Sequence, residues 1–312
     1  MKRLIVNADD FGETPGVNRG VLEAHRRGLV TSASILVNGQ AAKAALELSR
    51  QVPKLGLGVH LNLSEGIPLS PPRQIPTLVN NRGLLYLSHG QMRRALWKKQ
   101  VAARDIETEL RAQVTTVFES GAKPSHLDGH MHIHVLSGIS EIVVRLAREF
   151  GVPAVRCPLE APGRILRPPS QPVRSCSSLT RQRLVAFGVS LLARRLKWML
   201  QRAGLAYAEH FYGLVQPTFV DATCIETILK SVPEGTSELM CHPRYAEPEL
   251  LARGGELMQM REVEVQALTS PSAARLAETC NVRLSSYGDL AGSHSRNSGL
   301  QPTATTQPTG TR

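Results

Sequence analysis

Residues 126–134 read HLDGHMHIH and contain four of the ten histidines of the chain together with one carboxylate. Neutral imidazole and carboxylate groups are the usual ligands of a catalytic divalent metal. On a β-strand, side chains of one parity share a face, and here these are His126, Asp128, His130, His132 and His134. A strand does not need five polar groups on its core face for packing, so the stretch predicts a metal or catalytic site.

Two simpler interpretations of this stretch stay open. A solvated strand end or a chance histidine-rich patch would have the same composition. The spacing also matches neither a zinc finger nor an HExxH motif. Support for a metal site therefore has to come from other parts of the chain.

Strand-like and helix-like runs alternate along the rest of the chain. Strands are predicted at 3–8, 32–37, 55–63, 124–128, 152–156, 237–241 and 282–285, and helices at 18–27, 41–50, 91–120 and 137–150. This alternation is typical of an α/β fold with a parallel sheet, which is either open and doubly wound or closed into a barrel.

The positions of the polar residues favour the barrel. Residues that can carry chemistry follow the carboxyl ends of the predicted strands, namely Asp9 and Asp10, His60, the run 128–134, Arg156 and His242. In a (β/α) barrel these ends surround one mouth, where active sites lie. We therefore predict a distorted (β/α) barrel that forms one domain over residues 1–290.

Bulk composition limits the class of protein. The chain has 312 residues, of which 42% are hydrophobic, as is usual for a soluble globular protein. Its five cysteines form no CxxC pair, which favours reduced thiols over a disulfide framework. The start of the chain lacks a signal-peptide core, and no run of 18 apolar residues is present. These features predict a cytoplasmic protein without a membrane span.

Positive charge is concentrated in one segment. The chain carries a net charge of +11, and residues 161–208 contain nine Lys or Arg but no Asp or Glu. We interpret 161–208 as an insertion with a basic amphipathic helix at 179–202. It either packs on the barrel as a solvated helix, which is the commoner case, or contacts an anionic bilayer at the inner membrane face or an amphiphilic substrate. Residues 291–312 lack apolar periodicity and are predicted to be disordered.

Three separate parts of the chain can form one metal site. Asp10, His60 and His130 would present two imidazoles and one carboxylate to a metal and leave positions open for water and substrate. A metal-bound water has a lowered pKa, Asp9 could take its proton, and His242 could protonate a leaving amine. Together these residues predict metal-assisted amide hydrolysis. Asp9 could instead cap the following turn, and His60 could be a core histidine.

Four motifs in this order resemble the YdjC/ChbG carbohydrate deacetylases: NADDFG at 7–12, GVHLNL at 58–63, the run at 126–134 and MCHP at 240–243. The resemblance extends to about Asp289. It implies a distorted (β/α) barrel that removes the acetyl group from an N-acetylated sugar. It also implies one divalent metal, commonly magnesium, although two histidines suit zinc, cobalt or manganese at least as well.

The same resemblance implies roles for individual residues. Asp10, His60 and His130 would bind the metal, Asp9 would be the base, and His242 would be the general acid or an oxyanion partner. The basic insertion is closer to the hopanoid-biosynthesis-associated (HpnK-like) branch, which implies an N-acetylglucosaminyl hopanoid lipid as substrate.

The remaining polar residues receive supporting roles. His132 and Asp128 are predicted to bind substrate or to support the metal ligands, whereas His126 and His134 are predicted to be structural. Arg156 either steadies the carboxylates of the site or pairs with an acid at the barrel rim.

Other functions compete with the deacetylase. A metal-dependent hydrolase of a glycosidic or phosphodiester bond could use the same site. Nucleic-acid binding is the weakest interpretation, because the charge lies in one insertion and only 4% of residues are aromatic. The expected partner is thus an N-acetylated sugar or glycolipid and no nucleic acid. The oligomeric state stays open, with a homodimer as one option.

Overall fold

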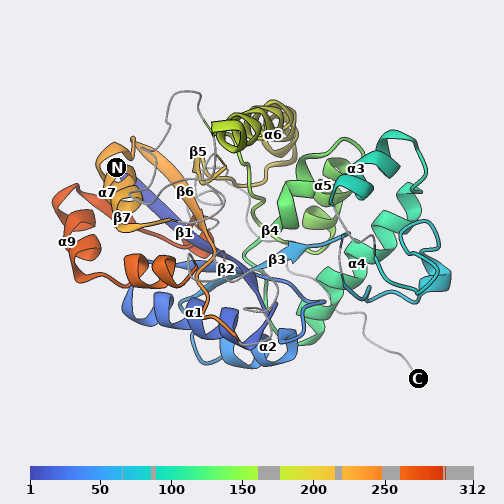
Figure 1. Ribbon diagram of the computed structural model, residues 1–312, viewed down its shortest axis with the longest axis horizontal. Coiled ribbons are helices and arrows are strands. Elements are labelled where there is room, and N and C mark those ends of the chain that lie inside the picture. Colours follow the sequence, from blue (N-terminus) through green and yellow to red (C-terminus); the bar gives the residue numbers. More distant parts are fainter. Residues whose placement is uncertain are drawn as a thin grey trace, which may run out of the picture.

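A curved parallel sheet forms the centre of the molecule, and helices surround it (Figure 1). The computed structural model describes residues 1–64, 66–85, 89–160, 176–214, 220–247, 261–290 and 292. Within these ranges the strands are β1 (Lys2–Phe11), β2 (Ser32–Ile35), β3 (Gly56–Leu61), β4 (His126–Gly129), β5 (His210–Tyr212), β6 (Gly235–Cys241) and β7 (Val282–Leu284).

The strand order is β4-β3-β2-β1-β6-β5, with β7 paired to the start of β1, and every pairing is parallel. β1 lies at the centre, and eight of its ten residues are buried because both faces of the strand are covered. The central strand therefore has a continuous apolar sequence, LIV at residues 4–6, before its polar carboxyl end.

Short backbone contacts continue the sheet between β4 and β5. The Leu127 N–H donates to the Ala154 carbonyl, the Arg156 N–H donates to the Leu127 carbonyl, and the Val155 N–H donates to the Ala206 carbonyl, at 2.9–3.0 Å. Because the segment after Ala206 leads into β5, which pairs with β6, these bridges bring the two edges of the sheet together. The predicted distorted (β/α) barrel is confirmed.

Two predicted elements differ from the structure. The strand expected at 152–156 is reduced to single bridges at Ala154 and Val155, and β5 was not predicted. The helix expected at 91–120 is two helices, α3 (His89–Trp97) and α4 (Ala103–Glu119). Lys99, between them, has a left-handed φ of 54°, which ends the first helix.

Four other helices match or extend the predictions, namely α1 (Pro15–Arg27), α2 (Ala42–Ser49), α5 (Ile139–Glu149) and α6 (Cys176–Ala203). The helices α7 (Ala222–Ser231), α9 (Pro271–Thr279) and the helical residues 261–268 were not predicted. α1 begins three residues before its predicted start, because Thr14 caps it and Pro15 opens it.

The predicted basic insertion is partly described. Its helix is α6, which packs through Ala193, Leu196 and Leu200 on the core next to α5. Residues 161–175, and the predicted tail except residue 292, lie outside the described residues. No described helix combines the length and the hydrophobicity that crossing a bilayer requires.

Candidate metal centre

The nine-residue histidine run changes conformation in its middle. β4 ends at Gly129, and residues His130–Val135 form a 3-10 helix (η2) in which Met131 and His132 have left-handed φ angles of 50° and 58°. The prediction that five polar side chains of the run line one strand face is therefore wrong. The turn packs tightly on Gly129, where a Cβ would lie 3.0 Å from the Ile133 and His134 side chains.

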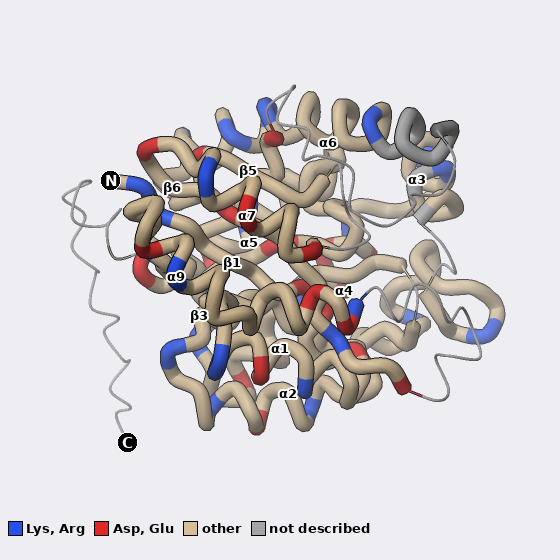
Figure 2. Tube along the Cα trace, turned by 60° about the vertical axis from the view of Figure 1, so that its left-hand side comes forward, with Lys and Arg blue, Asp and Glu red and all other residues tan. Residues whose placement is uncertain are grey.

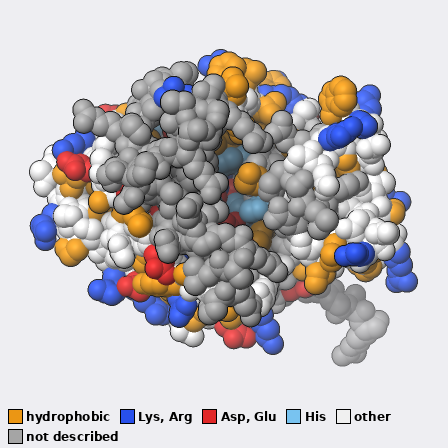
Figure 3. All heavy atoms as spheres, viewed as in Figure 1, with side chains coloured by type: hydrophobic (Ala, Val, Ile, Leu, Met, Phe, Trp, Pro, Cys, Tyr) orange, Lys and Arg blue, Asp and Glu red, His pale blue; other side chains and the backbone are white. Residues whose placement is uncertain are grey.

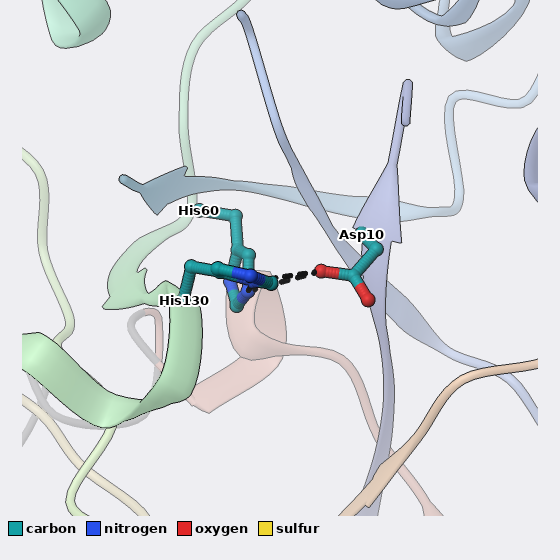
Figure 4. A group of neighbouring side chains, drawn as sticks. All are labelled: Asp10, His60 and His130. Atoms are coloured by element: carbon teal, nitrogen blue, oxygen red, sulfur yellow. Dashed lines mark hydrogen bonds and ion pairs between the residues drawn. The ribbon is translucent and has the colours of Figure 1, made fainter. Parts of the chain in front are cut away.

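Asp10 and two histidines converge at the carboxyl ends of β1 and β3 and directly after β4 (Figure 4). The His130 Nδ1 atom lies 3.1 Å from Asp10 Oδ1, His60 Nε2 lies 3.4 Å from the same oxygen, and the two nitrogens are 3.4 Å apart. One nitrogen or oxygen atom from each of these side chains could hold a single metal ion. We call Asp10, His60 and His130 the ligand trio.

The backbone of Asp10 explains how this side chain reaches the trio. The pairing of β1 with β2 shifts register between Ala8 and Phe11, and Asp10 has a φ of 67°. Aspartate tolerates this left-handed conformation better than most residues. Asp9 and Asp10 are adjacent in the chain, but they take part in different sets of contacts.

His60 is held by a carboxylate behind it. β3 and β4 pair so that His60 lies opposite Asp128, and the Asp128 Oδ1 atom is 2.8 Å from His60 Nδ1. Ser34 donates a hydrogen bond to the other Asp128 oxygen at 2.6 Å. A carboxylate on one ring nitrogen orients the ring and leaves the other nitrogen free to bind a metal. Asp128 therefore lies directly behind one of the predicted ligands, and its role in supporting that ligand stays a prediction.

A buried ion cluster lies beside the trio. The Arg156 guanidinium donates to both Asp9 oxygens at 2.6 and 2.7 Å, to Glu238 at 2.8 Å, and lies 2.9 Å from Asp128. All four side chains are at most 3% exposed. We call Arg156, Asp9, Asp128 and Glu238 the Arg156 cluster. Arg156 therefore contacts three buried carboxylates inside the barrel, and its role in steadying them stays a prediction.

Burial and the Arg156 guanidinium shift the pKa values of the acids in the cluster. Burial alone would raise the pKa of Asp9, but the Arg156 guanidinium outweighs this effect and lowers the pKa below its ordinary value. Burial raises the pKa of Glu238 to about 7 despite the same guanidinium. Tyr287 donates a hydrogen bond to Glu238 at 2.5 Å. Asp9 is therefore ionised at neutral pH, with His60 Nε2 3.9 Å from its Oδ2 atom.

Asp9, His60 and Asp128 form a second group that could hold a metal. Arg156 already contacts both of these carboxylates, so a cation there would face a buried positive charge. The ligand trio fits a divalent cation better, because its three donor atoms approach one another and His130 is 21% exposed. Figure 3 shows histidine and acidic side chains at the centre of this face of the molecule.

His242 lies after β6, as predicted. Burial lowers the pKa of His242 to about 3, so the ring is neutral at pH 7. Burial alone would raise the pKa of Asp10, but the hydrogen bond and the charge interaction with His130 outweigh burial and lower this pKa well below its ordinary value. Its backbone N–H donates to Glu264 at 2.6 Å.

The other histidines of the run lie outside the trio. His126 is fully buried and stacks on Tyr287, with ring centroids 3.9 Å apart, and His134 Nε2 lies 3.2 Å from the Arg156 carbonyl. These contacts agree with structural roles. The His132 ring contacts the edge of Phe211 at 6.0 Å, and its buried Nδ1 atom has no hydrogen-bond partner.

Comparison with known proteins decides the family. The YdjC-like protein family matches residues 3–279, which is most of the chain. This chain belongs to the YdjC-like family.

YdjC-like relatives cover nearly the whole sequence. Carbohydrate deacetylases from Homo sapiens and Geobacillus stearothermophilus are each 34% identical to it, over 92% of this chain and 91% and 97% of their own lengths. The carbohydrate deacetylase of Thermoanaerobacter pseudethanolicus is 31% identical over 93% of this chain and 100% of its own length. The crystal structure of an Enterococcus faecalis protein that is named for a suggested cleavage of cellobiose-phosphate is 26% identical, with a TM-score of 0.71 over 93% of this chain and 98% of that one.

Several residues of this YdjC-like site were not predicted. Glu238 lies inside the apolar strand β6, where an isolated acid was the available signal for a buried partner. Arg244, two residues after His242, lies 3.5 Å from Asp10 and donates to Glu13 at 2.7 Å. Ser34 on β2 has no distinctive sequence signal, because it belongs to none of the four motifs.

Proposed function

We propose that this chain is a metal-dependent carbohydrate deacetylase that hydrolyses the amide of an N-acetylated sugar. The observation that carries the proposal is the ligand trio with an ionised carboxylate, Asp9, beside it. The names of the YdjC-like relatives support the reaction class.

Asp10, His60 and His130 would hold one divalent cation. When bound, the cation would lower the pKa of a water molecule and polarise the acetyl carbonyl. Two imidazoles and one carboxylate suit zinc, cobalt or manganese at least as well as the magnesium expected from family resemblance.

Asp9 accepts the proton of the attacking water in this proposal. Arg156 keeps Asp9 ionised and fixes the orientation of its carboxylate, which favours proton acceptance at one defined position. The low pKa also makes Asp9 a weak base, so catalysis depends on a water whose own pKa is lowered.

His242 stabilises the oxyanion that develops on the acetyl carbonyl in this proposal. A ring with a pKa of about 3 is neutral at pH 7 and can donate one N–H hydrogen bond to a developing oxyanion. This property favours the oxyanion role over the general-acid role, which would require prior protonation.

Acetate release tests the proposal. The chain is stripped with a chelator, reloaded separately with Mg²⁺, Zn²⁺, Co²⁺ or Mn²⁺, and incubated with diacetylchitobiose. We expect acetate release that depends on the metal and is abolished in Asp9→Asn while the metal stays bound. Asp289→Asn, which removes a carboxylate that accepts hydrogen bonds from Ser286, serves as the control. Near-normal activity of Asp9→Asn would remove Asp9 as the base.

A narrower proposal concerns the substrate. The basic segment at 161–208 supports an N-acetylglucosaminyl hopanoid lipid as the physiological substrate. Parallel incubation with this lipid and with diacetylchitobiose tests it, and turnover of only the disaccharide would reject the lipid.

A glycosidic or phosphodiester hydrolase remains the alternative. The name of the Enterococcus faecalis structure concerns cleavage of cellobiose-phosphate, which favours testing a phosphorylated disaccharide. A new reducing end or free phosphate, without acetate, would decide for this alternative.

A further inference from the structure

Helix α6 carries two apolar faces. One face, with Ala193, Leu196 and Leu200, is buried against the barrel. On the other face, Leu184, Phe187, Leu191 and Trp198 are 68%, 63%, 54% and 55% exposed. We call these four residues the outer stripe.

The spacing of the outer stripe shows that it is continuous. Phe187, Leu191 and Trp198 follow Leu184 by three, seven and fourteen positions, which places all four side chains along one line of the helix. A helix that only packs on a soluble barrel needs a single apolar face. A second line that includes exposed Phe and Trp side chains indicates a surface that binds something apolar.

Charge on α6 identifies the class of partner. The helix contains no acidic residue, and Arg183, Arg194, Arg195 and Arg202 are exposed beside the outer stripe. Arg202 lies over the Trp198 ring at 4.9 Å, and Arg195 pairs with Glu141 on α5. Figure 2 shows the basic positions along α6, and Figure 3 shows hydrophobic side chains gathered at the edge where α6 lies in Figure 1. The partner is therefore apolar and anionic.

A second copy of the chain is a poor candidate for this partner. A symmetric contact between two outer stripes would bring the arginines of both α6 helices together, and the helix has no acidic residue to compensate them. An anionic bilayer accepts both features, because apolar side chains enter the acyl boundary while arginines remain at the phosphates.

We propose that the outer stripe of α6 docks this protein peripherally on an anionic bilayer. The helix lies in the plane of the interface and does not cross it. This proposal is independent of the proposed deacetylase reaction, because it uses no residue of the ligand trio or the Arg156 cluster.

Vesicle co-sedimentation of the full chain tests the docking surface. The wild type should sediment with phosphatidylcholine vesicles that contain phosphatidylglycerol, and much less with phosphatidylcholine alone. In Leu184→Ser/Phe187→Ser/Leu191→Ser the partition coefficient should fall at least about tenfold. The matched control is Ile67→Ser/Leu69→Ser/Val263→Ser, which removes three exposed apolar side chains elsewhere and should bind like the wild type.

Charge is tested by a second pair of variants. Arg183→Gln/Arg194→Gln should bind anionic vesicles more weakly and with less dependence on salt, whereas Lys43→Gln/Lys54→Gln, which removes two charges on and after α2, should not. Absence of wild-type sedimentation with anionic vesicles, or equal binding by the triple α6 variant, would overturn the proposal.

A fluorescence measurement locates the contact. The chain has two tryptophans, so Trp97→Phe leaves Trp198 as the single reporter. Its emission should shift to shorter wavelength and be quenched by brominated lipid when anionic vesicles are added. An unchanged Trp198 spectrum would show that the outer stripe does not contact the bilayer. If the chain did not bind vesicles and formed a dimer in sedimentation velocity that the triple variant abolished, the stripe would be a contact between two copies of the chain. Circular dichroism of each variant checks that its helix content is retained.

Discussion

The ligand trio and the Arg156 cluster are neighbours, but they balance charge in opposite ways. In the cluster, one guanidinium contacts three buried carboxylates, so the protein itself supplies the counter-ion. In the trio, one carboxylate oxygen and two imidazole nitrogens face one another, and the nearest described arginine contact to Asp10 is Arg244 at 3.5 Å. The carboxylates of the cluster are thus paired with a cation of the protein itself, whereas the donor atoms of the trio could hold a metal cation.

This difference gives two adjacent carboxylates different partners. Asp9 belongs to the cluster and Asp10 to the trio, although a single peptide bond joins them. The left-handed backbone at Asp10 directs the two carboxylates into different surroundings. Removal of Arg156, the shared counter-ion of the cluster, should therefore affect folding, removal of the Asp9 carboxylate should affect the proposed proton transfer, and variants in the trio should affect metal binding.

The largest effect is expected from removing the counter-ion of the cluster. Arg156→Met leaves Asp9, Asp128 and Glu238 buried without their shared guanidinium, which should lower the free energy of unfolding by about 3–5 kcal/mol. Denaturant unfolding at pH 7 measures this loss. Arg111→Met is the matched control, because the 36% exposed Arg111 also contacts two acids, Glu107 and Glu149, and should cost at most about 1 kcal/mol. Similar losses in both variants would show that the cluster does not stabilise the barrel.

Removing one residue of the ligand trio should lower metal binding and activity much more than stability. His130→Ala should lower metal occupancy and acetate release together, with activity reduced more than about 100-fold. The stability of the metal-free protein should change little, because His130 is partly exposed. Elemental analysis and thermal unfolding with a chelator measure the two quantities, with His25→Ala on α1 as the control. Full metal occupancy in His130→Ala would contradict the ligand assignment.

Asp128 joins the two regions, so its replacement should have a smaller, mixed effect. Asp128→Asn weakens both the support of His60 and the contact with Arg156, and the affinity for the metal should fall about 10–100-fold. Titration with the reloaded metal measures the affinity. Asp105→Asn is the control, since Asp105 is also a buried carboxylate but binds Thr77. An unchanged affinity in Asp128→Asn would show that the carboxylate does not orient His60.

Much of this comparison could be predicted from the sequence. Carboxyl ends of parallel strands meet at one mouth, so the positions of Asp10, His60 and His130 after apolar runs predicted that they converge. The sequence did not predict how His130 reaches the trio. That position depends on two consecutive left-handed residues, Met131 and His132, and neither is a glycine that would have signalled the turn.

The Arg156 cluster was harder to predict for a different reason. Its partners come from β1, β4 and β6, and only the closure of the sheet makes them neighbours. Glu238 has no motif of its own, and the position of Arg156 at a strand end is equally consistent with a rim salt bridge. Side-chain pairing across a barrel therefore requires the register of the strands, which residue spacing alone does not provide.

The smallest effect at pH 7 concerns His126, which lies in the same nine-residue run as His130 but packs in the core. Burial lowers the pKa of His126 to about 3, and the unfolded chain has the ordinary value near 6.5. The unfolded state therefore binds the proton first as pH falls. The stability contributed by the neutral ring is complete above about pH 6.5 and is lost between pH 6.5 and 3, by at most about 1.4 kcal/mol per pH unit.

Replacing this ring should make the free energy of unfolding less dependent on pH below neutrality. In His126→Leu, folding should no longer displace the proton of this ring between pH 6 and 4.5. The slope of the unfolding free energy against pH should therefore decrease by nearly 1.4 kcal/mol per pH unit, which corresponds to nearly one bound proton. Denaturant unfolding at several pH values, with a chelator to exclude metal release, measures the slope independently of any change in absolute stability. Gly58 makes room for the ring, since a Cβ there would lie 2.3 Å from it, so Gly58→Ala should displace the ring and reduce the same slope. An unaltered slope in both variants would mean that His126 is not held neutral by the core, and the contrast with His130 within one run would fail.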